Sequence, residues 1–216
     1  MVYPALLSPW SSYVEHGNNE SSYMDHGFAM ISAVLKRADH ETFLVDLRSL
    51  KSWDHFRQVI TDSQFDMVLI SFLSCQEKYA REAVAVMKQI HPNKIIVAGG
   101  VHLSVTKTET YPNVDTIVWG EGEAHIVDIV DKVAKGEKPD ALYQLKQIEN
   151  LDDLPFVDRQ LFNPRMEETS PLLPMLPEPF VTIVAGRGCW GQCTFCAPSR
   201  ELISGKKCRI RSVKNF

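Results

Sequence analysis

The sequence predicts an α/β domain built on a doubly wound parallel sheet of about five strands. Over the first 135 residues, short apolar runs alternate with helical stretches. Each apolar run is four to six residues long and is bounded by polar residues or glycine. Such near-continuous apolar strands are typical of a parallel sheet that helices cover on both faces.

Five runs are expected to be the strands of this sheet. They are Ala5–Ser8, Thr42–Leu47, Asp66–Ser71, Lys94–Ala98 and Thr116–Trp119. Three stretches between or after them carry apolar residues at helical spacing and are expected to be helices. They are Phe28–Lys36, Glu77–Ile90, which His91 and Pro92 end, and Glu123–Val133.

A long polar segment follows the first expected strand. Residues 10–25 show no clean periodicity. In an open α/β sheet, ligands bind outside the carboxyl ends of the strands, which is where this segment would lie. The alternative interpretation is a tolerated insertion on the surface.

Composition and charge exclude several classes of protein. Of the 216 residues, 44% are hydrophobic and 23% are charged, which is ordinary for a globular protein. The net charge of −4 gives no basic footprint, so no nucleic-acid partner is expected. No apolar run approaches the roughly 20 residues of a membrane span. The first residues lack the features of a signal peptide, and we expect a cytoplasmic protein.

The chain divides into three parts by composition. Residues 1–135 form the α/β domain, and residues 136–179 are expected to be a proline-rich linker with little core of its own. Within the linker, Leu142–Ile148 is a candidate short strand. Phe180–Val184 is expected to be a new strand that runs into a cysteine cluster. Residues 180–216 are therefore expected to be the first βα unit of an incomplete second domain.

The cysteine cluster has metal-ligand spacing. Cys189, Cys193 and Cys196 lie within eight residues, which in a reducing compartment indicates metal binding before disulfides. Thiolates suit iron–sulfur clusters, zinc or copper(I). Three ligands are too few for a closed zinc site, but Cys208 could be a fourth, so a zinc knuckle stays open. Cys75 stands alone and is expected to be a plain thiol.

This cysteine triplet after an expected strand resembles the signature of the radical S-adenosylmethionine superfamily. Arg187-Gly188 before the triplet, Phe195 within it and residues 209–212 after it strengthen the resemblance. The resemblance implies that Cys189, Cys193 and Cys196 ligate a [4Fe–4S] cluster. It also implies that S-adenosylmethionine binds the open iron and is cleaved reductively to a 5′-deoxyadenosyl radical, with electrons from a reductant protein.

A second pattern lies at the ends of two expected strands. One strand ends in Ser71 and is followed by Leu73, and the next ends in Gly99 and Gly100. Paired glycines let a ligand tail pass between backbone segments, because no side chain blocks it. These elements resemble the S-x-L and G-G elements of cobalamin-binding Rossmann-like domains. The resemblance implies that the four residues contact cobalamin.

The segment Gly120–Glu123 has the sequence GEGE, which resembles an element of the cobalamin-binding region in the same superfamily. It adds Gly120 and Glu121 to the cofactor-binding candidates. Related cobalamin domains carry D-x-H-x-x-G, whose histidine ligates cobalt, whereas this chain has Asp25 adjacent to His26 and lacks the final glycine. His26 is therefore either a cobalt ligand or a residue that lines the pocket. His102, after the glycine pair, is a candidate for lining the pocket.

Nucleotide-binding alternatives lack their motifs. The chain has neither G-x-G-x-x-G after the first strand nor a P-loop. A flavodoxin-like flavin domain and a response-regulator receiver share the architecture, and fold alone does not decide between them. A receiver would need acidic residues after the first strand, which ends in Ser8 and Pro9.

Together these patterns predict the cobalamin-binding portion of a cobalamin-dependent radical S-adenosylmethionine enzyme. The parent enzyme is expected to transfer a methyl group to an unactivated carbon or phosphorus centre, and the alternative is a radical cyclisation or rearrangement. These residues alone are expected to be a cofactor-binding module without catalysis, because most of a catalytic barrel is absent. A zinc-stabilised interaction protein is the third interpretation. The sequence does not predict the substrate or the oligomeric state.

Overall fold

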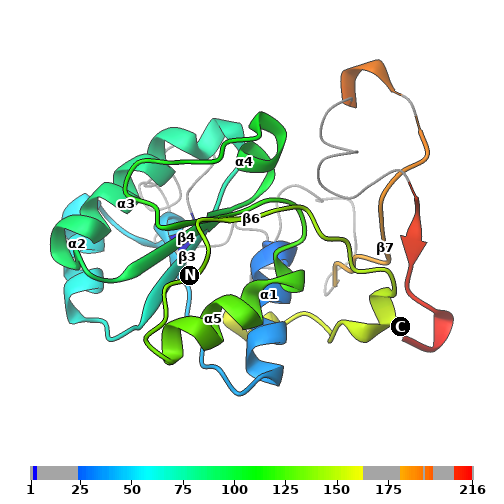
Figure 1. Cartoon of the computed structure of the whole chain (residues 1–216), viewed down its shortest axis with the longest axis horizontal. Coiled ribbons are helices and arrows are strands. Elements are labelled where there is room, and N and C mark those ends of the chain that lie inside the picture. The colour runs from blue at the N-terminus through cyan, green and yellow to red at the C-terminus, as the bar shows by residue number, and fades with distance from the viewer. Residues whose placement is uncertain (1, 4–23, 163–180, 192, 197–206, 216) are drawn as a thin grey trace.

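The computed structural model describes residues 2–3, 24–162, 181–191, 193–196 and 207–215. Within them a six-stranded sheet forms in which all neighbouring strands are parallel (Figure 1). In spatial order its strands are β2 (Val45–Asp46), β1 (Val2–Tyr3), β3 (Met67–Ser71), β4 (Ile95–Gly99), β5 (Thr116–Val118) and β6 (Leu142–Tyr143). The strand order reverses between β1 and β3, which is the kind of position where open α/β sheets bind ligands.

Helices cover both faces of the sheet, as Figure 1 shows. They are α1 (His26–Arg37), α2 (Trp53–Asp62), α3 (Glu77–Ile90), α4 (Val101–Thr106) and α5 (Ile126–Ala134). The helices α2, α3 and α4 contribute buried residues to one hydrophobic cluster. The helices α1 and α5 contribute to a second cluster on the opposite face. The doubly wound α/β prediction is confirmed.

The two clusters follow from the period of two along each strand. In β3, Val68 and Ile70 join the α2–α3 cluster, whereas Leu69 between them joins the α1–α5 cluster. In β4, Ile96 and Val97 separate in the same way. Because both faces are buried, positions 67–70 of β3 and 95–98 of β4 are all apolar, which is the near-continuous pattern that the sequence shows.

Most expected elements lie within a few residues of their positions in the structure. The strands β3, β4 and β5 and the helices α1 and α3 are confirmed, while α5 begins later than expected because a 3₁₀ turn at Gly122–Ala124 precedes it. The expected strand Ala5–Ser8 lies outside the described residues, and β1 lies at Val2–Tyr3.

Two helices were not predicted. In α2, Trp53, Phe56 and Ile60 are spaced for one helix face, and the Ser52 side chain accepts a hydrogen bond from the His55 amide as an N-cap. That signal was readable in the sequence. The helix α4 has only six residues, which is too short to show a clear period.

The segment after residue 135 packs more closely on the sheet than its composition predicted. The strand β6, within the candidate strand Leu142–Ile148, pairs with β5 and extends the sheet to six strands. Leu151, Leu154 and Phe162 are buried in the α1–α5 cluster. The expectation of little core therefore needs correction up to residue 162, because a few apolar side chains are enough to hold a loop against a helix layer.

The cysteine-bearing part of the chain forms a small antiparallel pair. The described residues 181–184 form no strand, contrary to the expectation for Phe180–Val184. Instead β7 (Gly186–Arg187) pairs with β8 (Arg209–Ile210), and the Arg211 amide donates to the Ala185 carbonyl at 2.9 Å. A strand forms where a neighbour takes up its backbone hydrogen bonds, and only this stretch has such a neighbour.

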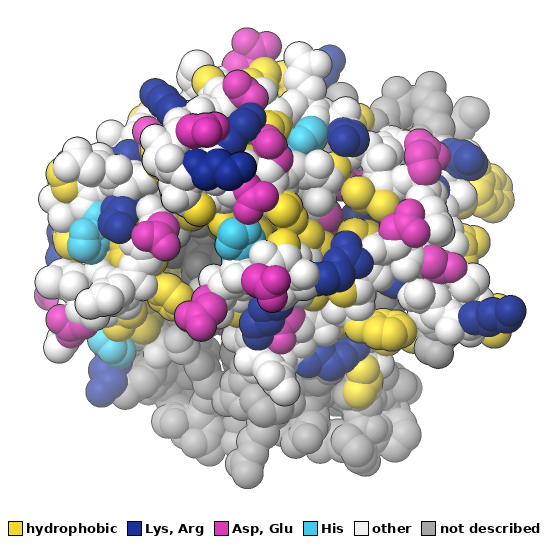
Figure 2. Space-filling model, turned by 60° about the horizontal axis from the view of Figure 1, so that its bottom comes forward, with side chains coloured by type: hydrophobic (Ala, Val, Ile, Leu, Met, Phe, Trp, Pro, Cys, Tyr) yellow, Lys and Arg dark blue, Asp and Glu magenta, His cyan; other side chains and the backbone are white. Residues whose placement is uncertain are grey.

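In the part of the chain that the structure describes, no helix is long and apolar enough to cross a membrane. On the face that Figure 2 shows, acidic and basic side chains are interspersed among apolar ones. That face carries no extended basic area, in agreement with the net charge of −4.

Candidate cofactor-binding site

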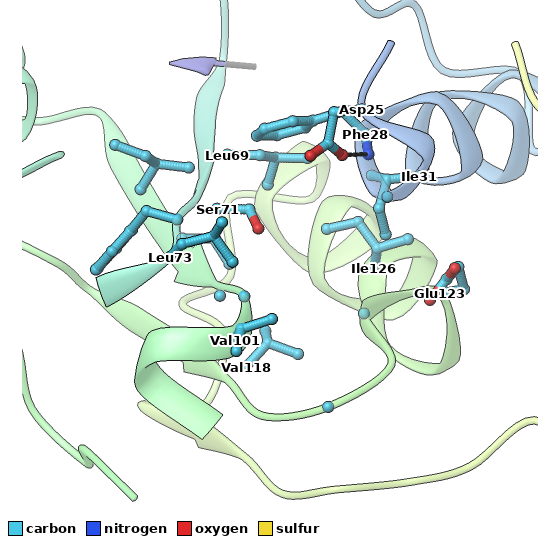
Figure 3. A pocket seen from close by; sticks show the side chains of 18 of the residues that line it. Asp25, Phe28, Ile31, Leu69, Ser71, Leu73, Val101, Val118, Glu123 and Ile126 are labelled. Carbon is cyan, nitrogen blue, oxygen red and sulfur yellow. Dashed lines mark hydrogen bonds between the residues drawn. The ribbon is translucent and has the colours of Figure 1, made fainter. Parts of the chain in front are cut away.

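A cavity of about 340 Å³ lies at the carboxyl ends of β3, β4 and β5, facing the first turn of α1. Its volume falls within the range of small-molecule sites in proteins. The wall is mostly apolar, and the labelled side chains surround the cavity in Figure 3. The apolar members are Phe28, Ile31, Leu69, Ile70, Phe72, Leu73, Val97, Val101, Val118 and Ile126.

Gly99 and Gly100 close one side of this cavity together with Ser71 and Leu73. Gly100 has φ of 96°, in the region that favours glycine. A Cβ atom on Gly100 would lie 2.6 Å from Ser71 Oγ and 2.8 Å from the Phe72 amide nitrogen. The glycine is therefore required both by its backbone conformation and by the close approach of the chain after β3. The structure brings together the four residues that the sequence predicted here.

Asp25 adds a carboxyl group to the cavity, and sequence reasoning did not propose it as a site residue. As the N-cap of α1, its Oδ1 accepts a hydrogen bond from the Phe28 amide at 2.8 Å (Figure 3). Burial raises the pKa of Asp25 above its usual value, and this effect outweighs the hydrogen bonds from Phe28 and Gly27. An Asp directly before an apolar-periodic helix is a recognisable N-cap signal that could have found it.

The two predicted histidines do not line this cavity. His26 Nε2 lies 3.0 Å from Thr182 Oγ1, and the residue faces a second cavity. His102 Nδ1 lies 3.0 Å from Ser74 Oγ, and its ring packs on Phe72. Neither histidine is part of the wall of this cavity, and their contact with the cofactor stays a prediction.

The GEGE segment is split between two roles. Gly120, with φ of 76°, lines the cavity, and its amide donates to Ser104 Oγ at 2.9 Å. Glu121 is not among the residues that line the cavity, and its buried carboxylate pairs with Arg209, with Nη1 to Oε2 at 2.9 Å. Glu121 therefore lies outside the wall of this cavity, and its contact with the cofactor stays a prediction.

Glu123 lines the cavity and also holds Arg187, whose Nη2 donates to Glu123 Oε1 at 2.5 Å. Burial alone would lower the pKa of Arg187, but Glu123 and Glu121 raise it above its usual value. Arg187 is therefore a permanent cation. It lies two residues before Cys189 in the sequence.

A second cavity of about 670 Å³ lies between the α/β domain and the cysteine-bearing segment. Gly27, Gly120 and Glu123 line both cavities, so the two are adjacent. Residues of the cysteine-bearing segment contribute to the second cavity alone, among them Ile183, Gly186 and Arg187.

The thiols of the cysteine cluster are exposed. The Gly191 amide donates to Cys189 Sγ at 3.3 Å, and a Cβ on Gly191 would lie 3.3 Å from that sulfur and 3.8 Å from Cys193 Sγ. Two sulfurs thus lie next to Gly191, and N–H···S hydrogen bonds of this kind are a feature of iron–sulfur sites. Among the described residues, no three potential ligands are close enough together to hold a metal ion.

Comparison with known proteins agrees with the geometry of the first cavity. The family described as B12 binding domain matches residues 17–130, over half of the chain. The chain belongs to this family. The B12-binding domain includes α1, the carboxyl ends of β3, β4 and β5, and the GEGE segment, which are the elements around the cavity.

Three relatives share low identity over most of the chain. One is an uncharacterized methyltransferase of Pyrococcus horikoshii, 27% identical over 87% of this chain. Another is the anaerobic magnesium-protoporphyrin IX monomethyl ester cyclase of Cereibacter sphaeroides, 26% identical over 87%. The third is the bacteriochlorophyllide d C-8(2)-methyltransferase of Chlorobaculum tepidum, 27% identical over 74%. The predicted resemblance to cobalamin-dependent radical S-adenosylmethionine enzymes is confirmed.

This chain spans 43%, 31% and 34% of the lengths of these three relatives. The similarity to each of them extends beyond the B12-binding domain itself, because the aligned parts are longer than residues 17–130.

The cavity of the B12-binding domain fits part of a cobalamin molecule. Gly100 makes a close backbone contact with Ser71 and Phe72, here called the cradle, that leaves no room for a Cβ atom, and the apolar wall suits an aromatic base. The polar groups are few and are contributed by Asp25, Ser71, Gln76 and Glu123.

Proposed function

We propose that this chain binds cobalamin with its tail in the cavity beside Gly100 and forms the cofactor-binding portion of a radical S-adenosylmethionine enzyme. The observation that carries the proposal is the cradle at Gly100, where any side chain would collide with Ser71 and Phe72. This cradle lies inside the segment that matches the B12 binding domain. Residues 1–135 would be the cobalamin-binding domain, 136–179 the linker and 180–216 the start of the radical domain.

Each cavity residue has a definite task in this proposal. Gly99, Gly100 and Gly120 line the cavity without a side chain, while Ser71 supplies a hydroxyl and Leu73 an apolar contact. Because the apolar wall excludes water, a single hydrogen bond inside it contributes more to orientation than it would in solvent. When bound, cobalamin supplies methyl-group carriage at cobalt, and these residues hold it in place.

Cys189, Cys193 and Cys196 are the proposed thiolate ligands of a [4Fe–4S] cluster, with S-adenosylmethionine and a reductant protein as partners. The soft ligand type and the hydrogen bond from Gly191 to Cys189 support this assignment. Cys208 Sγ lies 3.6 Å from the Gly188 carbonyl oxygen. Anaerobic reconstitution followed by iron and zinc analysis decides between the cluster and a zinc knuckle, which would give stoichiometric zinc without iron.

For the parent enzyme we propose methyl transfer, because two of the three relatives are named as methyltransferases. The alternative is cyclisation, because another relative is named as a cyclase. We further propose that this chain alone is a non-catalytic module. Formation of 5′-deoxyadenosine by the reconstituted chain would contradict the proposal of a non-catalytic module. If the chain binds cobalamin and forms no 5′-deoxyadenosine, the result agrees with that proposal.

The proposal is tested by titrating hydroxocobalamin into the protein and following its visible spectrum. Gly100→Ala is expected to weaken binding by about tenfold or more, because the new Cβ would collide with Ser71 and Phe72 and displace them from the cavity wall. Gly136→Ala is the matched control: φ is also positive, at 75°, but a Cβ there would meet nothing within 4 Å. Equal affinities for both variants would remove the cradle from the proposal, and no binding by the unmodified protein would overturn it.

A further inference from the structure

Two carboxylates of the GEGE segment face two arginines of the cysteine-bearing segment. Arg209 Nη2 lies 2.5 Å from Glu121 Oε1, and Arg187 Nη2 lies 2.5 Å from Glu123 Oε1. Arg187 Nη1 is also 3.6 Å from Glu121 Oε2. The two arginines are register partners in the β7–β8 pair. An acidic pair on the B12-binding domain thus meets a basic pair that flanks the cysteines.

The Glu121–Arg209 pair is buried and well hydrogen-bonded. The side chains of Glu121 and Arg209 are 4% and 2% exposed. The Ile148 amide donates to Glu121 Oε2 at 2.8 Å, and Arg209 Nη1 donates to the Ile148 carbonyl at 2.6 Å. A buried pair of this kind becomes strongly unfavourable when one partner loses its charge, because the other charge stays out of water.

Arg211 continues the attachment with hydrogen bonds to the backbone of the first part of the chain. Its Nη1 and Nη2 donate to the carbonyls of Leu154 and Pro155 at 3.1 and 3.0 Å. The hydrogen bonds of Arg209 and Arg211 come from alternate residues of one extended stretch. Figure 1 shows this stretch beside the α/β domain, close to β7.

The two carboxylates differ in which cavity they reach. Glu121 lines only the second cavity, whereas Glu123 lines both. Gly122 between them packs against α1, where a Cβ would lie 3.1 Å from Ile31 Cδ1. Glu123 therefore connects the first cavity with Arg187.

We propose that Glu121 tethers the cysteine-bearing segment to the B12-binding domain, and that Glu123 is a positioning residue that couples occupancy of the cofactor cavity to the placement of Cys189. The coupling rests on the proposed function, because it takes cobalamin as the ligand of the cavity. The path is short: Glu123 lines the cavity, its carboxylate holds Arg187, and Cys189 follows two residues later. A coupling between two sites is reciprocal by thermodynamic necessity.

The tether is tested by hydrogen exchange of the whole chain, followed by mass spectrometry of peptides that cover residues 181–191 and 207–215. In Glu121→Gln, exchange of these peptides is expected to rise by about tenfold or more, because the buried Arg209 loses its counter-charge. Asp140→Asn is the control, since Asp140 forms an ion pair on an exposed surface with Lys132. Arg209→Gln approaches the same contact from the other side and keeps the test valid if Glu121→Gln does not fold. Unchanged exchange in a folded variant overturns the tether.

The coupling is tested by repeating the exchange with and without hydroxocobalamin. In the unmodified protein, hydroxocobalamin is expected to slow exchange around Arg187, and in Glu123→Gln this protection is expected to fall by about fivefold or more. Glu121→Gln should bind hydroxocobalamin with nearly unchanged affinity, because Glu121 does not line the first cavity. Protection in Glu123→Gln equal to that in the unmodified protein overturns the coupling.

The outcomes separate this inference from the proposed function. If the unmodified protein binds no hydroxocobalamin, both the proposed function and the coupling fail, while the tether is still judged by exchange of the free protein. If the unmodified protein binds hydroxocobalamin, and Glu123→Gln shows the same protection from exchange as the unmodified protein, the proposed function stands and the coupling alone fails.

Discussion

The cofactor cavity and the cysteine-bearing segment are built in different ways. The cavity is formed within the packed α/β domain, by the ends of three buried strands, the first turn of α1 and mostly apolar side chains. The cysteine segment is held mainly by side chains, through Arg187, Arg209 and Arg211, and its thiols are exposed. A site built from packed strands and apolar side chains depends on many contacts, whereas a segment held by charged contacts can be released by changing one of them.

The largest effect on stability is expected from a substitution in the hydrophobic core of the α/β domain. Phe56 is fully buried in the α2–α3 cluster, and Phe56→Ala is expected to lower the free energy of unfolding by about 3–5 kcal/mol. Phe156, next to the second cavity, is 67% exposed, and Phe156→Ala is expected to change the free energy of unfolding by less than about 0.5 kcal/mol. Urea denaturation of both variants measures the difference. Similar losses would show that the segment around Phe156 is as much part of the core as α2.

A smaller effect is expected at Asp25, which belongs to the cavity but is held by a helix cap. Asp25→Ala is expected to cost about 1 kcal/mol of unfolding free energy, because the Phe28 amide loses its acceptor. Asp25→Asn keeps an oxygen acceptor and removes the titratable carboxyl group, whose pKa is raised by burial.

The sign of the pH effect at Asp25 follows from linkage. Because its pKa is higher in the folded protein, the unfolded chain releases the proton first as the pH rises above the usual value of 3.8. The stability of the unmodified protein relative to Asp25→Asn therefore falls as the pH rises from that value to the folded-state pKa, and is constant above it. Thermal unfolding at a series of pH values measures this. A relative stability that rises with pH over this range would contradict the assignment.

The smallest effect is expected at His26, which faces the second cavity. His26→Ala should leave the visible spectrum of bound hydroxocobalamin unchanged and alter its affinity by no more than about twofold, because His26 Nε2 contacts Thr182. A spectrum that shifts on losing His26 would make this histidine a cobalt ligand. That outcome would also mean that the ligand draws the helix start away from Thr182.

Local patterns were sufficient for most of the cavity. Gly99, Gly100, Ser71 and Leu73 could be placed together from the sequence, because parallel strands end at one edge of the sheet. The directions of the His102 and Glu121 side chains could not be read from the sequence, because the direction of a side chain just after a strand depends on the next turn. The sequence offered Leu142–Ile148 as a candidate strand, but it did not predict the pairing of β6 with β5 or the packing of residues 151–162, since a proline-rich composition does not reveal which few side chains pack.

By itself the sequence determined the doubly wound sheet, the glycine cradle and the metal-ligand spacing of the cysteines, because each depends on a period or on neighbouring residues. Only the tertiary structure decided that, in the GEGE segment, Glu121 lines the second cavity alone whereas Glu123 lines both cavities. It also paired Glu121 with Arg209 across 88 residues of chain. Such a contact leaves no local pattern, since it depends on how two distant segments pack and on burial that strengthens the attraction between their charges.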